Sequence, residues 1–173
     1  MISRRGALFL ALLAAGVLAQ PATALARKSS KLWATVNICD TLRYPNQMGV
    51  RASMPGDGSR KRMYMRFRAQ FLDTSTNRWH NVKGTADSGW VLAGSARYVA
   101  REAGWTFSFK PPAAGAAFTL RGAVNFQWRA RKRVNGKLRT VVVRRTQLIT
   151  QGGQKSPVGA DPPGYSAGTC QIQ

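Results

Sequence analysis

The sequence predicts an all-β protein: a single antiparallel β-sandwich of the immunoglobulin-like kind, with about seven to nine strands and one disulfide. Three observations support this fold class. Apolar and polar residues alternate with a period of two along several stretches, Gly- and Pro-rich turns separate these stretches, and Cys39 and Cys170 lie far apart in the chain. A closed β-barrel is the alternative. With no internal repeat, heptad pattern or linker, we expect residues 27–173 to form one domain.

Residues 1–26 are predicted to be a signal peptide. Arg4 and Arg5 precede an apolar run over 7–19, and Ala24-Leu25-Ala26 is a typical cleavage site. About 13 apolar residues are too few to span a bilayer, which takes roughly 20. We therefore expect cleavage after Ala26 and a secreted, extracytoplasmic protein. The arginine pair partly resembles a twin-arginine signal, so both that route and the general secretory route remain open.

The first strands alternate clearly. Over 32–38 one face carries Leu32, Ala34, Val36 and Ile38, and the other carries Trp33, Thr35 and Asn37. Over 62–71 the predicted inward residues are Met63, Met65, Phe67, Ala69 and Phe71. Their outward neighbours are Arg62, Tyr64, Arg66, Arg68 and Gln70. This pattern is typical of strands with one face on a core and one in water.

The same alternation continues in the second half of the chain. One predicted strand carries Trp105, Phe107 and Phe109 on its apolar face. Another carries Leu120, Gly122, Val124, Phe126, Trp128 and Ala130. Shorter strands are predicted at 48–53, 79–83, 90–92 and 97–101. A Gly- and Pro-rich loop over 151–164 precedes a short last strand that contains Cys170.

Asn135-Gly136 is the strongest turn signal, because Asn and Gly tolerate the positive φ angles of a type I′ hairpin turn. A two-residue turn here places Trp128 opposite Val143 and Ala130 opposite Val141. Further along, this register would set Phe126 against Arg145. We therefore predict a β-bulge at Arg144-Arg145, which brings Leu148 beside Val124.

Two cysteines in an exported chain most simply form one disulfide, Cys39–Cys170, that ties the first strand to the last. Two free thiols or a redox pair are the alternatives. One histidine and two distant cysteines cannot supply a metal-ligand set, so neither a metal nor another cofactor is predicted.

The segment Ala123-Val124-Asn125-Phe126-Gln127-Trp128-Arg129 precedes a Gly-containing turn, a basic strand and a late cysteine. Over residues 33–172 this order resembles the immunoglobulin-like or fibronectin-like modules of small secreted actinobacterial proteins of unknown function. The resemblance implies a sandwich and carries no catalytic motif. The chain departs from true immunoglobulin domains, whose two cysteines bridge the sheets centrally.

The chain is strongly basic, with 27 Lys and Arg against 6 Asp and Glu and a net charge of +21. Such a charge favours polyanionic partners, although it can also reflect composition and confer solubility alone. The candidate polyanion-binding residues are Arg62, Arg66 and Arg68, and around the predicted hairpin Arg129, Arg131, Lys132, Arg133, Lys137, Arg139, Arg144 and Arg145. Alternatively, these charges keep exposed strands from pairing with other chains.

Few groups suit catalysis. His80 is the only histidine and Glu102 the only glutamate, and Ser88 and Asp87 complete a Ser-His-Asp set on paper alone. We therefore expect no enzymatic activity. Trp33, Trp79 and Trp90 could be surface rings for carbohydrate or could simply pack within the protein.

The function predicted is a secreted, non-enzymatic binding module. Its basic hairpin would contact an anionic cell-wall polymer or an acidic glycan. Nucleic acid is not expected, because the protein is exported and few aromatic residues interleave with the basic clusters. The alternatives are a structural or protein-interaction domain without a polyanion role, an inhibitor or antimicrobial factor, and an unrecognised enzyme acting on polysaccharide.

Overall fold

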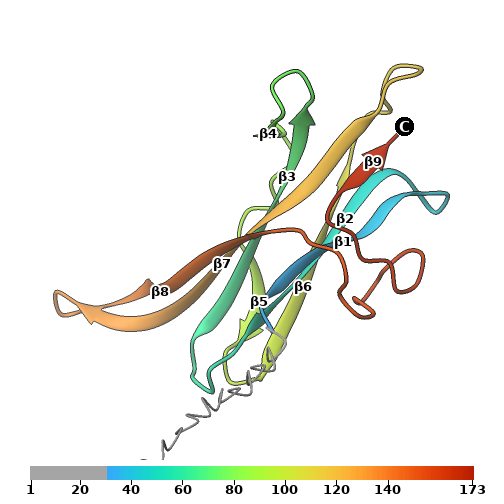
Figure 1. Ribbon diagram of the computed structural model, residues 1–173. Helices are drawn as coiled ribbons and strands as arrows, with labels where there is room; N and C mark the ends of the chain where they lie inside the picture. Colours follow the sequence, from blue (N-terminus) through green and yellow to red (C-terminus); the bar gives the residue numbers. More distant parts are fainter. Residues whose placement is uncertain (1–30) are drawn as a thin grey trace, which may run out of the picture.

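The computed structural model describes residues 31–173, which form two antiparallel sheets packed face to face (Figure 1). The predicted signal peptide lies outside the described residues. The smaller sheet has the order β1-β2-β6, and the larger has the order β4-β3-β7-β8, with β5 also paired to β3 and β9 to β7. Neither sheet closes on itself, so the sandwich is confirmed and the barrel alternative is wrong.

The described chain contains nine strands, in agreement with the predicted number. They are β1 (Trp33–Thr41), β2 (Tyr44–Pro55), β3 (Arg62–Asp73), β4 (Arg78–Asn81), β5 (Val91–Ser95), β6 (Ala100–Ser108), β7 (Phe118–Val134), β8 (Lys137–Ile149) and β9 (Cys170–Ile172). The two short strands expected at 97–101 and around 105–109 are one continuous strand, β6.

One hydrophobic core lies between the sheets. Its largest fully buried side chains include Trp128, Phe67, Phe126, Met48, Met54, Met63, Met65 and Leu120. The alternation predicted for 63–69 and 120–128 is therefore confirmed. Trp128 also satisfies its indole N–H, which donates to the carbonyl of Pro55 at 3.0 Å.

Two aromatic residues predicted to face inward are exposed instead. Phe71 is 39% exposed and lies near the end of β3, where its ring centroid is 5.6 Å from that of His80. Trp105 is 41% exposed and lies on β6, the edge strand of the smaller sheet. Alternation shows which face a side chain takes, but not whether the opposing layer extends far enough to cover it.

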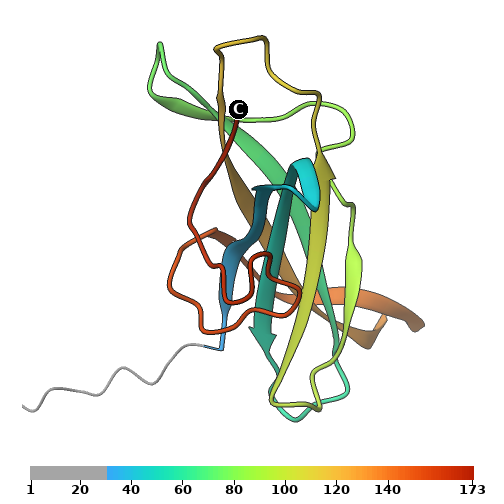
Figure 2. The same ribbon diagram turned by 90° about the vertical axis from the view of Figure 1, so that its right-hand side faces the viewer.

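The C-terminal loop buries the second face of β1, an effect that alternation did not predict. Thr35 is fully buried and Asn37 is 6% exposed, although both point away from the core. Val36 and Ala167 exchange backbone hydrogen bonds of 2.9 and 3.0 Å, so the loop seals the free edge of β1. Figure 2 shows this loop, in orange and red, beside the blue β1 strand.

The predicted disulfide is present. Cys39 and Cys170 are joined across 131 positions of sequence, with their Cα atoms 5.3 Å apart. Cys39 belongs to β1 and Cys170 to β9, so the bond links the smaller sheet to the larger one. It also holds β9 against β1.

The Asn135-Gly136 turn is confirmed, with φ angles of 48° and 74° at these two residues. The pairs Ala130–Val141 and Val124–Leu148 are also as predicted. The bulge, however, lies closer to the turn than expected. Trp128 pairs with Arg144 and not with Val143, because the register shifts between Trp128 and Arg129.

The bulge position has a physical reason. It sets the guanidinium of Arg144 4.4 Å from the Trp128 ring centroid, a favourable cation–π geometry at the edge of the core. Val143 is left as the unpaired residue and is 36% exposed. The prediction at Arg144-Arg145 was wrong in position, but the core register beyond the bulge is the one expected.

Candidate functional site

The hairpin formed by β7 and β8 projects beyond the rest of the sandwich (Figure 1). Residues 131–140 are exposed throughout. Because side chains alternate along a strand, the predicted basic cluster divides between two faces. Arg129, Arg131 and Arg133 lie on one face of the hairpin, and Lys132, Lys137 and Arg139 lie on the other.

The face of β3, β7 and β8 that points away from the core is here called the outer face. Its polar and aromatic members include Arg62, Tyr64, Arg66, Arg68, Gln70, Arg121, Asn125, Gln127, Arg129, Arg131, Arg133, Thr140, Arg145 and Gln147. Seven of the eleven predicted polyanion-binding residues therefore share one surface. The other four, Lys132, Lys137, Arg139 and Arg144, do not belong to it.

Two arginines of the outer face are direct cross-strand neighbours. Arg62 of β3 lies opposite Arg129 of β7. Like charges directly opposite each other destabilise a sheet. The Arg129 guanidinium is turned aside, 4.1 Å from the Tyr64 ring centroid and 4.9 Å from that of Trp90. Its Nε also donates to Gln127 Oε1 at 2.8 Å, so the charged group is held in a defined position.

These contacts correct the expectation that aromatic residues interleave little with the basic clusters. Trp79 also lies beneath a guanidinium, that of Arg121, at 4.1 Å. Tyr64 can be assigned to this surface from its alternation with Arg62 and Arg66, but Trp90 cannot be assigned to it from its sequence neighbours. Trp90 immediately precedes β5, which pairs with β3, and only the sheet topology brings it to the outer face.

A pocket of about 290 Å³, the arginine pocket, opens at the base of the projecting hairpin. Its lining consists of Arg60, Arg62, Tyr64, Arg129, Ala130, Arg131 and Thr140. Four arginines thus line one pocket, and no acidic residue lines it with them. Within residues 31–173, none of the four takes part in an ion pair.

Arg66 differs from the other arginines of the outer face because it is paired. Its Nε and Nη2 donate to both oxygens of Asp87, at 2.6 to 3.0 Å. The hydrogen bond from Arg66 holds the pKa of Asp87 below its usual value, against the opposing effect of burial. Arg68 lies beside this pair, and its buried Nε has no hydrogen-bond partner in the described part of the chain.

A second pocket of the outer face, here called the amide pocket, has a volume of about 370 Å³. Its lining consists of Trp90, Asn125, Phe126, Gln127, Arg145, Thr146 and Gln147. Asn125 Nδ2 is buried and makes no hydrogen bond to any described residue. Sequence analysis did not select these amide side chains, because Asn and Gln on an exposed strand face carry no signal of their own.

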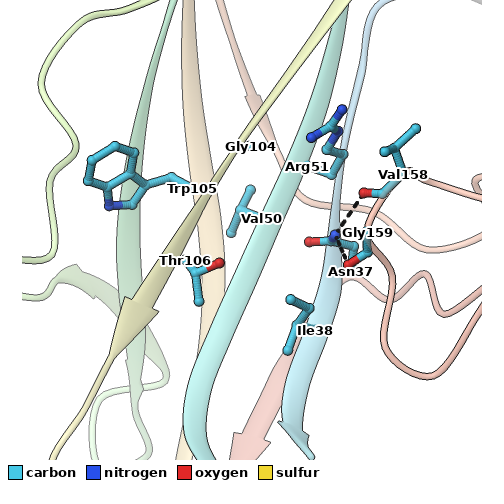
Figure 3. A pocket seen from close by; sticks show the side chains of 9 residues that line it. All are labelled: Asn37, Ile38, Val50, Arg51, Gly104, Trp105, Thr106, Val158 and Gly159. Atoms are coloured by element: carbon cyan, nitrogen blue, oxygen red, sulfur yellow. Dashed lines mark hydrogen bonds between the residues drawn. The ribbon is translucent and has the colours of Figure 1, made fainter. Parts of the chain in front are cut away.

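A pocket of about 450 Å³ lies on the smaller sheet, lined in part by Asn37, Arg51 and Trp105 (Figure 3). Its Asn37 amide nitrogen and its Arg51 guanidinium already have partners. Asn37 Nδ2 donates to the carbonyls of Val158 and Gly159 at 3.2 and 3.0 Å. Arg51 Nε lies 3.3 Å from a carboxylate oxygen of Glu102. We attribute this pocket to the anchoring of the C-terminal loop.

The candidate catalytic residues do not converge. His80 Nε2 lies 3.9 Å from an oxygen of Asp73 rather than near Asp87. Ser88 Oγ accepts a hydrogen bond from the Phe67 N–H and donates to the Gly89 carbonyl, so it fixes the backbone beside β3. Between residues 31 and 173, no cluster of three or more His, Cys, Asp or Glu could hold a metal ion.

No protein-family model matches the chain, and no curated protein matches it. No helix between residues 31 and 173 has the length and apolar character needed to cross a membrane. The function must therefore be inferred from the chemistry of the side chains described above.

Proposed function

We propose that the protein is an exported, non-enzymatic binding module that holds an anionic cell-surface polymer against its outer face. The arginine pocket carries this proposal. Four arginines and no acidic residue line this pocket, so positive charge is concentrated there, and a bound anion would relieve the repulsion between the neighbours Arg62 and Arg129. Guanidinium groups also bind carboxylates and phosphates through paired hydrogen bonds, which favours this class of ligand.

Export is part of the proposal. The signal-like residues 1–26 support it, and the Cys39–Cys170 disulfide is compatible with an oxidising compartment. The partners proposed are therefore polymers found outside the cytoplasm, an anionic cell-wall polymer or an acidic glycan.

The position of the hairpin suits a long ligand better than a small one. Residues 131–140 are exposed on both faces and extend the row of outer-face arginines beyond the core. A polymer can contact this row and the arginine pocket at once, so that several weak electrostatic contacts act together.

Retention on isolated cell wall tests the proposal. The disulfide-bonded protein is applied to wall with and without its anionic polymers, at about 0.05 M and about 0.2 M salt. Binding that requires the polymers and falls steeply with salt is the expected result. Absence of retention at the lower salt would contradict the proposal and favour a structural or protein-interaction role.

A further inference from the structure

We propose that the amide pocket binds a sugar unit of an acidic polysaccharide, so that the polymer held by the outer face is a glycan carrying carboxylates. This inference rests on the proposed function and specifies the chemical class of its ligand. The residues that would recognise the sugar are Trp90, Asn125, Gln127, Arg145 and Gln147.

Four of these residues form a compact block on the outer face. Gln127 lies opposite Arg145, and Asn125 lies opposite Gln147, two positions further along the β7–β8 ladder. Cross-strand partners and residues two apart on a strand share a face, so the four side chains rise from the same patch. The fifth residue, Trp90, lines the pocket from the segment next to β3.

The amide groups favour hydroxyl ligands over phosphate. A carboxamide offers both donors and an acceptor, as a sugar hydroxyl does, whereas a phosphate oxygen in a polymer accepts only. Three carboxamides in one pocket therefore match a ligand that both donates and accepts hydrogen bonds. Asn125 Nδ2 is buried and has no partner in the described chain, so the side chain must rotate before this donor can meet a hydroxyl in the pocket.

Arg145 and Trp90 supply the remaining contacts. Arg145 is exposed, takes part in no ion pair within the described residues, and lines the pocket beside the amides. Its guanidinium can bind a uronate carboxylate on the same sugar that the amides bind. The half-buried Trp90 ring offers an apolar surface to the C–H face of the sugar.

The amide pocket lies next to the arginine pocket, because Gln127 of the first is hydrogen-bonded to Arg129 of the second. Gln127 lines the amide pocket, while its Oε1 accepts a hydrogen bond from Arg129, which lines the arginine pocket. Along β7, Asn125 and Arg131 are separated by about 20 Å, at the usual rise per residue. One glycan chain can therefore contact both pockets.

Single-stranded nucleic acid fits this surface less well. Stacking of successive bases requires open aromatic faces. The Tyr64 and Trp90 rings both have the Arg129 guanidinium within 5 Å of their centroids. The Arg129 guanidinium therefore covers part of both rings, so two open rings are not left for successive bases, whereas a single sugar needs only the part of Trp90 that lines the amide pocket.

The test compares three polyanions: polygalacturonate, inorganic polyphosphate and oligo(dT). Dissociation constants are measured for the disulfide-bonded wild-type protein, for Asn125→Ala and for Trp90→Ala. Asn81→Ala and Trp79→Ala are matched controls, because both residues lie on the larger sheet outside the amide pocket. Thermal unfolding of each variant verifies that the fold persists.

We expect Asn125→Ala to weaken polygalacturonate binding about tenfold, the effect of one lost hydrogen bond, and to change polyphosphate binding less than twofold. Trp90→Ala should weaken polygalacturonate binding at least as much, and the two controls should change neither ligand. Equal losses for polygalacturonate and polyphosphate, or losses confined to oligo(dT), would overturn the sugar assignment and leave the polyanion role intact. If the wild-type protein binds none of the three polymers, both proposals are wrong.

Discussion

Arg66 and Asp87 form a bidentate ion pair on the outer face, with Arg66 Nε 2.8 Å from Oδ1 and Nη2 2.6 Å from Oδ2 of the carboxylate. Asp87 also accepts a hydrogen bond from the Gly89 N–H at 2.9 Å. The carboxylate therefore neutralises one arginine of the outer face and fixes the segment that leads to Trp90. The uncompensated charge is shifted toward the hairpin end of the sheet, where the arginine pocket lies.

The first prediction concerns Asp87→Asn. This change keeps the side-chain shape but releases Arg66, so the affinity for an anionic polymer at low salt should rise about twofold to fivefold, the range of one exposed charge contact. The thermal unfolding midpoint at neutral pH should fall, because the ion pair is lost. Asp73→Asn removes the same charge and is the control, since Asp73 is the last residue of β3, at the end away from the arginine pocket. Equal gains in both variants would show that only net charge matters.

A second prediction concerns acid stability. The pKa of Asp57 is lowered from 3.8 to about 2, first by its hydrogen bond from Lys61 and then by that from Ser59. A carboxylate with a depressed folded pKa stabilises the fold above its unfolded pKa, and this contribution is lost as the pH falls through the folded pKa. The unfolding midpoint should thus decline between about pH 4 and pH 2. The decline should be shallower in Asp57→Asn. If the unfolding midpoint of the variant falls as steeply as that of the wild type, Asp57 does not contribute to stability in this pH range.

The third prediction concerns the disulfide. Because Cys39 and Cys170 are 131 positions apart, their bond strongly restricts the unfolded chain. The double variant Cys39→Ser/Cys170→Ser should lose about 4–5 kcal/mol of unfolding free energy, the upper estimate of the chain-entropy relation. Denaturant unfolding of the variant and the oxidised wild type measures this difference. A loss below about 1 kcal/mol would mean that the C-terminal loop and β9 are held by their other contacts alone.

A fourth prediction concerns Gly122, where β7 passes close to β2. A Cβ atom at this position would lie 2.8 Å from Val50 Cγ2 and 2.8 Å from Thr150 Cγ2. Gly122→Ala should therefore destabilise the protein by about 1–3 kcal/mol through overpacking. Gly168→Ala is the control, because its nearest neighbour would be at an ordinary 3.5 Å. Similar stability of the two variants would show that the sheets separate easily at this point.

Much of the fold could be predicted because its signals are local. The alternation at Met63, Met65 and Phe67 depends only on strand geometry, and the Asn135-Gly136 turn depends only on two backbone conformations. Burial of Thr35 and Asn37 could not be predicted, because it results from a loop more than a hundred residues later in the chain. The bulge was misplaced for a similar reason: the contact of Arg144 with Trp128 is tertiary.

The candidate site was predictable in charge but not in arrangement. The clusters of basic residues in the sequence identified Arg62, Arg129 and Arg131. Only the β3–β7 register, however, makes Arg62 and Arg129 neighbours. The role of Trp90 depends on the pairing of β5 with β3, and that of Asn125 on its unpartnered Nδ2. Neither property is visible in the residue type or its sequence neighbours.

The central claim is that the outer face, and not positive charge in general, binds an anionic polymer. Two triple variants that remove equal charge test it most directly. One is Arg62→Gln/Arg131→Gln/Arg133→Gln, on the outer face, and the other is Lys132→Gln/Lys137→Gln/Arg139→Gln, on the opposite face of the same hairpin. We predict that the first variant weakens polymer binding at least tenfold more than the second, with no loss of thermal stability in either. Equal weakening in the two variants would contradict the account.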